Sequence, residues 1–183
     1  MKKVILSLCL LTLAACQSAP SNIIIQPNYT ATGNQLIGKQ FDVNVRDVRA
    51  SNSALKVINK DGPTTVPSNN LSQSLHKTLI DALKRHGASS DTQTNNQLEL
   101  KIHQLEAIVK QETLKYRSES VIELELVINQ GNRRFAKYYN GNQQSEGPLL
   151  HDKARIESDL NTLLEQLISR MVTDQELKQF LQG

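Results

Sequence analysis

The sequence predicts an α+β fold, a two-layer sandwich in which two helices cover one face of a mainly antiparallel sheet. Apolar and polar residues alternate at period two in several runs, most clearly from Ile122 to Ile128. In two longer segments, Leu71 to His86 and Leu149 to Val172, apolar residues recur at steps of three and four. This order of strands and helices leaves the second face of the sheet to solvent or to a partner.

The first sixteen residues, MKKVILSLCLLTLAAC, predict a cleaved lipoprotein signal peptide at residues 1–15. Two lysines precede a short apolar run, and Ala14 and Ala15 precede Cys16. This ending resembles the lipobox of bacterial lipoproteins, which implies diacylglycerol on the sulfur of Cys16 and an acyl chain, such as palmitate, on its amino group. The alternatives are an ordinary signal peptide in which Cys16 is incidental, a core helix, and a transmembrane helix, although about 12 apolar residues fall short of the ~20 that span a bilayer.

Sorting and domain organisation follow from the residues after Cys16. Gln17 stands where inner-membrane retention in enterobacteria-like lipoproteins usually needs Asp, so the resemblance implies the outer membrane. Residues 16–35 are expected to form a lipid anchor and tether, because residues 17–22 and 30–35 are polar and contain Pro20 and Gly33. Within them, residues 23–27 (IIIQP) predict an edge strand or a membrane-proximal arm. Residues 36–183 are expected to form a single α+β periplasmic domain.

The charge balance argues against nucleic-acid binding. Removing the signal peptide takes two of 21 basic residues and leaves 19 against 18 acidic ones, so no basic excess remains. Of two cysteines, Cys9 lies in the signal peptide and Cys16 carries lipid, so the mature domain has no disulfide.

The first strands are predicted between residues 36 and 58. Phe41, Val43 and Val45 alternate with polar residues, and the strand bulges or ends near Arg46. Residues 54–58 can pair with this strand before the turn at 61–63 (DGP).

Three further strands follow the first helix. From Leu98 to Val109 the apolar residues first occupy even-numbered and then odd-numbered positions, which predicts a bulge near His103. A type II′ turn at Gly131 and Asn132 would connect the next two strands as a hairpin. Its register places Ile128 opposite Phe135, Leu124 opposite Tyr139 and Glu125 opposite Tyr138. Residues 141–148 then close the sheet.

The helix ends carry local signals. Ser68, Asn69 or Asn70 can cap the first helix, and Gly87 suits its C-terminal left-handed position. Residues 173–176 (TDQE) predict a capping box for a last short helix that buries Leu177, Phe180 and Leu181.

No catalytic, cofactor or metal site is predicted. The four histidines lack metal spacing, and neither a Gly-x-Ser-x-Gly elbow nor a Gly-rich phosphate loop occurs. Glu119, Glu123 and Glu125 share a strand, and charge compensation from the hairpin partner (Arg133, Arg134 and Lys137) explains them. The alternative is an envelope enzyme that acts on peptidoglycan through Glu123 or Glu125.

Four residues are candidates for a partner interface. Tyr116 and Tyr138 are candidates because tyrosine gives a large contact area at low entropy cost. Arg133 and Arg134 belong to a weak basic patch that could face anionic lipid or peptidoglycan. The expected partners are the membrane, through the lipid, and an envelope protein or peptidoglycan.

The order of motifs resembles the YajG family of uncharacterised bacterial lipoproteins. The similarity runs from the lipobox through residues 23–27 and 43–49 (VNVRDVR), the helix ending at Gly87, the strands around Gly131 and the terminal helix. The resemblance implies outer-membrane lipidation and a periplasm-facing α+β domain, and it carries no catalytic residues to transfer. We therefore expect a non-enzymatic interaction or scaffold module of the cell envelope.

Overall fold

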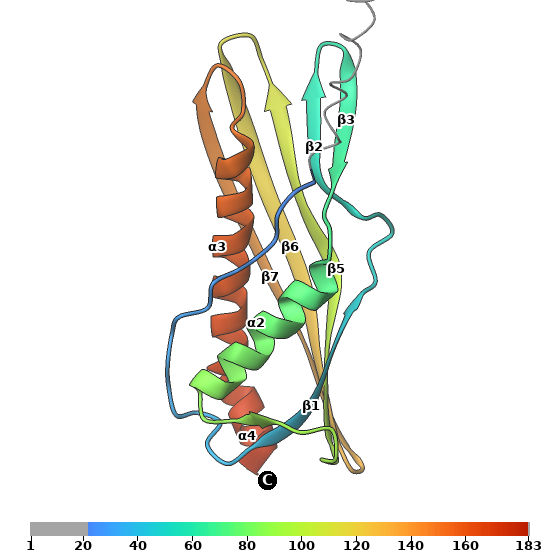
Figure 1. The fold of residues 1–183 in the computed structure, drawn as a ribbon, viewed down its shortest axis with the longest axis vertical. Helices are drawn as coiled ribbons and strands as arrows, with labels where there is room; N and C mark the ends of the chain where they lie inside the picture. Colours follow the sequence, from blue (N-terminus) through green and yellow to red (C-terminus); the bar gives the residue numbers. More distant parts are fainter. Residues whose placement is uncertain (1–21, 183) are drawn as a thin grey trace, which may run out of the picture.

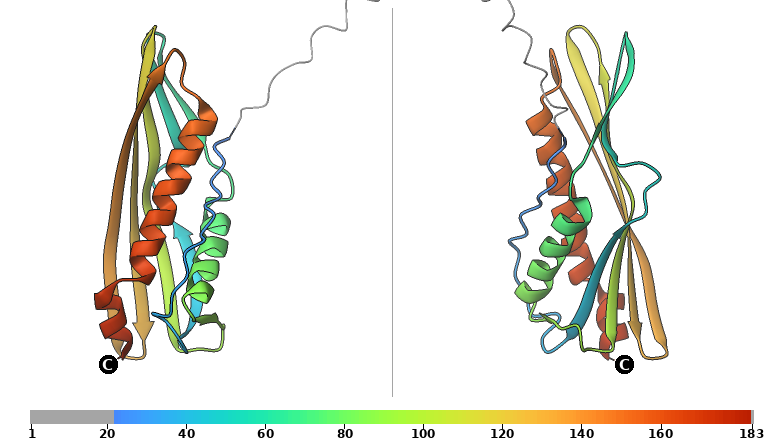
Figure 2. Two further views of the ribbon diagram at one scale, coloured as in Figure 1. Left: turned by 90° about the vertical axis from the view of Figure 1, so that its left-hand side faces the viewer. Right: turned by 45° about the vertical axis from the view of Figure 1, so that its right-hand side comes forward.

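The computed structural model describes residues 22–182, which form a seven-stranded sheet with helices packed on one face (Figures 1 and 2). The predicted signal peptide and the two sites Cys16 and Gln17 lie outside the described residues. In chain order the elements are β1 (Gln40–Asp47), β2 (Ser53–Asn59), β3 (Gly62–Pro67), α2 (Leu71–Arg85), β4 (Ser89–Ser90), β5 (Asn96–Gln111), β6 (Lys115–Gln130), β7 (Arg133–Pro148), α3 (Lys153–Val172) and α4 (Gln175–Gln182).

The sheet is built on a long antiparallel meander of β5, β6 and β7, each 16 residues long. The free edge of β5 pairs in parallel with two shorter strands placed end to end. β1 pairs with residues 97–102, and β2 pairs with residues 107–110. The predicted pairing of residues 54–58 with the first strand is therefore wrong, because both strands take β5 as their partner and β2 completes its other edge with β3. The sheet is mixed, although most of its pairing is antiparallel.

The predicted bulge and hairpin register are confirmed. The register of β5 against β6 shifts between Ile102 and Gln104, which lies between the stretches paired with β1 and β2. At the hairpin turn Gly131 adopts a φ of 58°, and the three predicted pairs are all formed. Turn chemistry and apolar alternation specify the same register, so local sequence was sufficient here. Residues 141–148 continue β7 to its end.

The helices bury the stripes that their periodicity predicts. In α2 the buried apolar residues are Leu71, Leu75, Leu79, Ala82 and Leu83. In α3 they are Ile156, Leu160, Leu163, Leu164, Leu167, Ile168, Met171 and Val172. Both helices lie over the same face of the sheet, which Figure 2 shows edge-on. We call this the inner face and the opposite side the outer face.

The helix ends differ in detail from the predictions. Gly87 has a φ of 90°, as expected for the left-handed position after a helix. Asn70 precedes α2 but makes no side-chain capping bond, because its own backbone is left-handed. Asp174, rather than Thr173, caps α4, since its carboxylate accepts hydrogen bonds from the backbone of Glu176 and Leu177. Leu177 and Leu181 are buried, and Phe180 is half-buried.

Residues 23–29, which we call the strap, run as an extended segment between α2 and α3 (Figure 2). We assigned them to the tether, yet Ile23, Ile25 and Tyr29 are buried in the core. Ile23 forms an isolated parallel bridge with Ser68. The packed domain therefore begins before residue 36, because alternate apolar residues of the strap fill the space between the helices.

Polar rows on both helices hold the backbone of the strap. On α3, Glu157, Asn161 and Glu165 accept hydrogen bonds from the N–H groups of residues 24, 26 and 28, at 2.9, 2.8 and 2.6 Å. On α2, Ser74 and Thr78 donate to the carbonyls of residues 25 and 27. Four residues of a helix rise about 6 Å along its axis, and two residues of an extended chain span about 6.6 Å. Side chains spaced four residues apart on a helix can therefore bond to every second peptide group of the strap.

Candidate functional site on the outer face of the sheet

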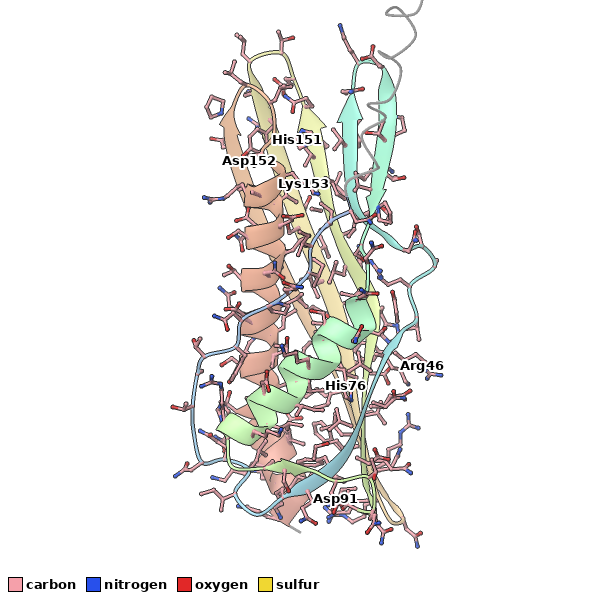
Figure 3. All side chains as sticks on the ribbon, viewed as in Figure 1. Arg46, His76, Asp91, His151, Asp152 and Lys153 are labelled. Atoms are coloured by element: carbon pink, nitrogen blue, oxygen red, sulfur yellow. The ribbon has the colours of Figure 1, made fainter. Side chains whose placement is uncertain are left out.

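The outer face is the uncovered side of the sheet, and polar residues of four strands meet there. The Cα register places Arg46 of β1 beside Lys101 of β5, Lys101 beside Glu125 of β6, and Glu125 beside Tyr138 of β7. Figure 3 shows Arg46 projecting from the side of β1, away from the helices. The topology thus brings four residues from distant parts of the chain into one row.

Glu125 is the centre of this row. It is only 7% exposed although it lies on the outer face. Its Oε2 accepts hydrogen bonds from Nε2 of His103 at 2.9 Å and from Nζ of Lys101 at 3.3 Å. The hydrogen bond from His103, followed by that from Lys101, outweighs burial and lowers the pKa of the Glu125 carboxyl. Glu125 is therefore a fixed, charged acceptor.

The charged row continues from Glu125 towards the edge of the sheet. Lys101 also lies 3.8 Å from Glu99, and Glu99 lies 3.0 Å from Arg46, whose side chain is 56% exposed. Charges of alternating sign thus run across three strands. We call the set of Arg46, Glu99, Lys101, His103, Glu125 and Tyr138 the outer-face cluster.

Tyr138 supplies an exposed aromatic ring at the other end of the cluster. Its side chain is 53% exposed, and its ring centre lies 5.3 Å from the ring of His103 at a tilt of 47°. The imidazole, itself held by Glu125, supports one side of the phenol ring and leaves the other to solvent. Of the predicted interface residues, Arg134 also lies on this side of β7 and is exposed.

The other two predicted interface residues are not on this face. Tyr116 is 6% exposed and points into the core, where it packs against Gly147, a residue without a side chain to obstruct it. Arg133 lies at the hairpin end on the helix side, with its guanidinium 4.5 Å from the ring centre of Phe180. Both differences follow from strand parity, since even positions of β6 and odd positions of β7 face the helices.

The predicted charge compensation of the glutamates comes from a different strand. Lys137 of β7, one of the predicted partners, lies on the inner face instead. Its ammonium group pairs there with Asp174, the cap of α4, at 2.8 Å and with Glu176 of α4 at 3.0 Å. β5 therefore supplies the cations that neutralise Glu125. A glycosidase acid needs a raised pKa, whereas that of Glu125 is lowered. A hollow of about 570 Å³ lies nearer the turn between β5 and β6, away from Glu125, and its charged lining residues are Lys110, Arg117, Glu119 and Glu146.

Each histidine is occupied by a separate partner. His76 bonds the carbonyl of Val43, His86 bonds Tyr29 and Gln35, and His151 bonds Gln111. Figure 3 shows His76 on α2 and His151 at the start of α3, far apart in the fold. Among residues 22–182, no three His, Cys, Asp or Glu side chains are grouped so as to hold a metal ion. Over the same residues, no helix has both the length and the hydropathy to cross a bilayer.

A family described as uncharacterised lipoprotein matches residues 27–182. The chain belongs to this family. The resemblance to the YajG family is thereby confirmed over nearly the whole described domain. The comparison with curated proteins finds no match.

Two solved structures are similar to this chain at low sequence identity. Protein XCC0632 from Xanthomonas campestris is 14% identical, with a TM-score of 0.61 over 90% of this chain and 97% of that one. The rare lipoprotein B from Shewanella oneidensis is 10% identical, with a TM-score of 0.44 over 79% of this chain and 100% of that one. At 14% identity, the similarity to protein XCC0632 describes the fold alone.

Sequence reasoning identified Tyr138 and Arg134 but not the cluster behind them. The alternation in β1, β5 and β6 places Arg46, Lys101 and Glu125 on the polar side of their strands. Which strands become neighbours depends on the parallel pairing of β1 with β5, which no turn between them specifies. His103 beside the predicted bulge was the available signal, since bulges redirect side chains.

Proposed function

We propose that this protein is a lipid-anchored module of the outer membrane, faces the periplasm, and binds an envelope protein through the outer-face cluster without catalysing a reaction. Membership of a lipoprotein family and the lipobox at Cys16 support the anchor. Gln17 in the sorting position supports the outer membrane. Three acyl chains on one residue would hold the protein to a bilayer far more strongly than one chain, which anchors only reversibly.

The observation that carries the binding role is the ordered row of Arg46, Glu99, Lys101 and Glu125 beside exposed Tyr138. Arginine and tyrosine are the residues that contribute most to protein interfaces. Their supporting charges are already paired with one another, so a partner meets a preorganised surface and little side-chain entropy is lost. Charges of both signs within one row favour a folded protein surface over a uniformly charged polymer.

A photo-crosslinking amino acid at Tyr138 tests the binding role in intact cells. We expect a crosslinked product of defined mass from this position. The matched control is Thr162, which is exposed on α3 at the other side of the molecule and should give no such product. Arg46→Glu should reduce the yield from Tyr138 because it reverses the charge at the end of the row.

The outcomes separate the candidate partners. A product that a muramidase converts to smaller species identifies peptidoglycan and refutes the protein partner. Equal yields from Tyr138 and Thr162 would show that the outer face has no special role.

Membrane fractionation tests the anchor independently. Cys16→Ala removes the sulfur that carries the lipid, so the protein should leave the membrane fraction. Gln17→Asp keeps the lipid and should move the protein from the outer to the inner membrane. Unchanged membrane association of Cys16→Ala would exclude lipidation at this residue.

A further inference from the structure

Three exposed leucines gather at the end of the molecule where β5 turns into β6 and β7 leads to α3. Leu114 is 75% exposed, Leu149 63% and Leu150 75%. The backbone N–H of Leu149 donates to the carbonyl of Leu114 at 2.8 Å, so the two connections are joined. We call these three residues the leucine tip. Large apolar side chains exposed together indicate a surface that is covered in use.

The leucine tip is ordered by polar contacts rather than by burial of its side chains. The Gln111 amide donates to the carbonyl of Leu149 at 2.7 Å and accepts from the N–H of His151 at 3.0 Å. Leu149 has a φ of 60°, a left-handed conformation that leucine rarely adopts. The hydrogen bonds of its N–H to Leu114 and of its carbonyl to Gln111 hold this conformation, and its side chain is left in solvent. The neighbouring charges of Glu112 and Lys115 pair with each other at 3.8 Å.

The point where the strap enters the fold decides which end of the molecule lies near Cys16. Ile23 pairs with Ser68, and Arg49 bonds both Ser68 and the carbonyl of Leu105, so Ile23 is level with Leu105 on β5. From there the end of β5 next to the leucine tip, Gln111, is six strand residues away, about 20 Å, and the opposite end, Asn96, is nine residues away, about 30 Å.

The chain from Cys16 to Ile23 has seven residues and spans at most about 25 Å. A bilayer that holds the lipid on Cys16 is therefore within reach of the leucine tip. The opposite end of the sheet lies about 30 Å from the level of Ile23 along the long axis of the domain, which is farther than this chain segment can span.

We infer that the leucine tip inserts into the surface of the membrane that carries the Cys16 lipid and so holds the sheet upright, with the outer-face cluster facing sideways. The inference rests on the proposed lipid anchor. Removal of leucine side chains from water drives the contact in proportion to the area buried. The two attachments together fix an orientation that one flexible anchor does not.

A fluorescent probe on the full lipidated protein tests this orientation. Because Cys16 is acylated, Leu150→Cys introduces the sole free thiol of the mature chain, to which an environment-sensitive dye is attached. In vesicles of phosphatidylethanolamine and phosphatidylglycerol, we expect blue-shifted emission and loss of most quenching by iodide. The matched control, Asn132→Cys at the opposite hairpin, should remain fully quenched.

Flotation with the vesicles and the mass of the acylated peptide show first that the anchor itself is present, so failure of the anchor is recognised separately. With the anchor present, equal quenching at positions 150 and 132 overturns the inference. If the dye at position 150 is protected from iodide only at high protein density, a second copy of the protein covers the leucine tip. Protection confined to isolated outer membranes indicates a partner protein, and either result also overturns the inference.

Discussion

The hydroxyl of Tyr29 in the strap lies 2.8 Å from Nε2 of His86, at the C-terminal end of α2. Nδ1 of the same ring lies 2.6 Å from Oε1 of Gln35. The amide oxygen only accepts, so Nδ1 carries the proton and Nε2 accepts from the tyrosine. One neutral histidine thus joins the strap, the following loop and α2. Burial lowers the pKa of His86, which is 2% exposed.

We predict that acidification weakens the domain through His86. Its folded pKa lies below the ordinary value of 6.5, so the unfolded chain binds the proton more readily. The contribution of His86 to the free energy of unfolding is fully present above pH 6.5 and declines as the pH falls towards the pKa of the folded state. Urea unfolding at pH 7.5 and 5.5 measures the loss. In His86→Gln the loss over this interval should be smaller, and an identical loss in both proteins would contradict the prediction.

We predict that Asn161→Ala loosens the strap. The Asn161 amide accepts from the N–H of Gln26 at 2.8 Å and donates to the carbonyl of Ile24 at 3.2 Å. Net hydrogen-bond contributions suggest a loss of about 1 kcal/mol in the free energy of unfolding. Amide hydrogen exchange at Gln26 should become faster. The neighbouring exposed substitution Thr162→Ala serves as the control, and equal exchange in the two variants would refute the role of Asn161.

We predict that Arg49→Lys is more destabilising than Arg46→Lys. The Arg49 side chain is 5% exposed, pairs with Asp47, and donates to the carbonyls of Ser53 and Leu105. Lysine cannot reproduce this planar set of donors, so a loss of about 2 kcal/mol is expected. Arg46 is mostly in solvent, where one ion pair contributes about 0–1 kcal/mol. Thermal unfolding of both variants measures the difference, and equal midpoints would be inconsistent with it.

We predict that Glu125→Gln destabilises the domain at neutral pH, by about 1 kcal/mol, because it removes the charge that Lys101 and His103 bind. Since the hydrogen bond from His103 lowers the pKa of Glu125 below 4.5, its contribution is present above 4.5 and is lost as the pH falls through the folded value. Unfolding curves of wild type and variant should therefore converge in acid.

The control for that comparison is Glu123→Gln, on the same face of β6 and without an ion pair in the described chain. A difference between wild type and Glu125→Gln that persists unchanged at pH 3 would show that charge is not the cause.

The contrast between the hairpin and the parallel strands shows where sequence reasoning was sufficient. Gly131 and Asn132 set the register of β6 and β7 because turn geometry and apolar parity act over neighbouring residues. Residues 54–58 were correctly assigned as a strand, but their partner was wrong. Their pairing with Ala107 on β5 spans about fifty residues and a helix, and no local interaction specifies it.

The residues of the candidate site and of the strap show the same difference between local and long-range information. Exposure of Tyr138 and Arg134 follows from alternation along β7. Alternation along β6 likewise places Tyr116 on the buried side, and the missing side chain of Gly147 on the adjacent strand leaves room for its ring. The strap was assigned to the tether because a short apolar run next to Pro27 has no regular partner nearby. Its partners, Glu157 and Asn161, lie more than 130 residues away on α3.

The sequence by itself predicted the lipobox and its sorting residue. It also determined the helices, the bulge, the hairpin register and the strands other than β3 and β4, because each depends on residues close together in the chain. Only the tertiary structure decided that β1 and β2 share one edge of β5, that Lys101 and His103 neutralise Glu125, and that the strap fills the space between two helices. These contacts depend on which distant surfaces bury the most apolar area together, a choice that local periodicity does not record.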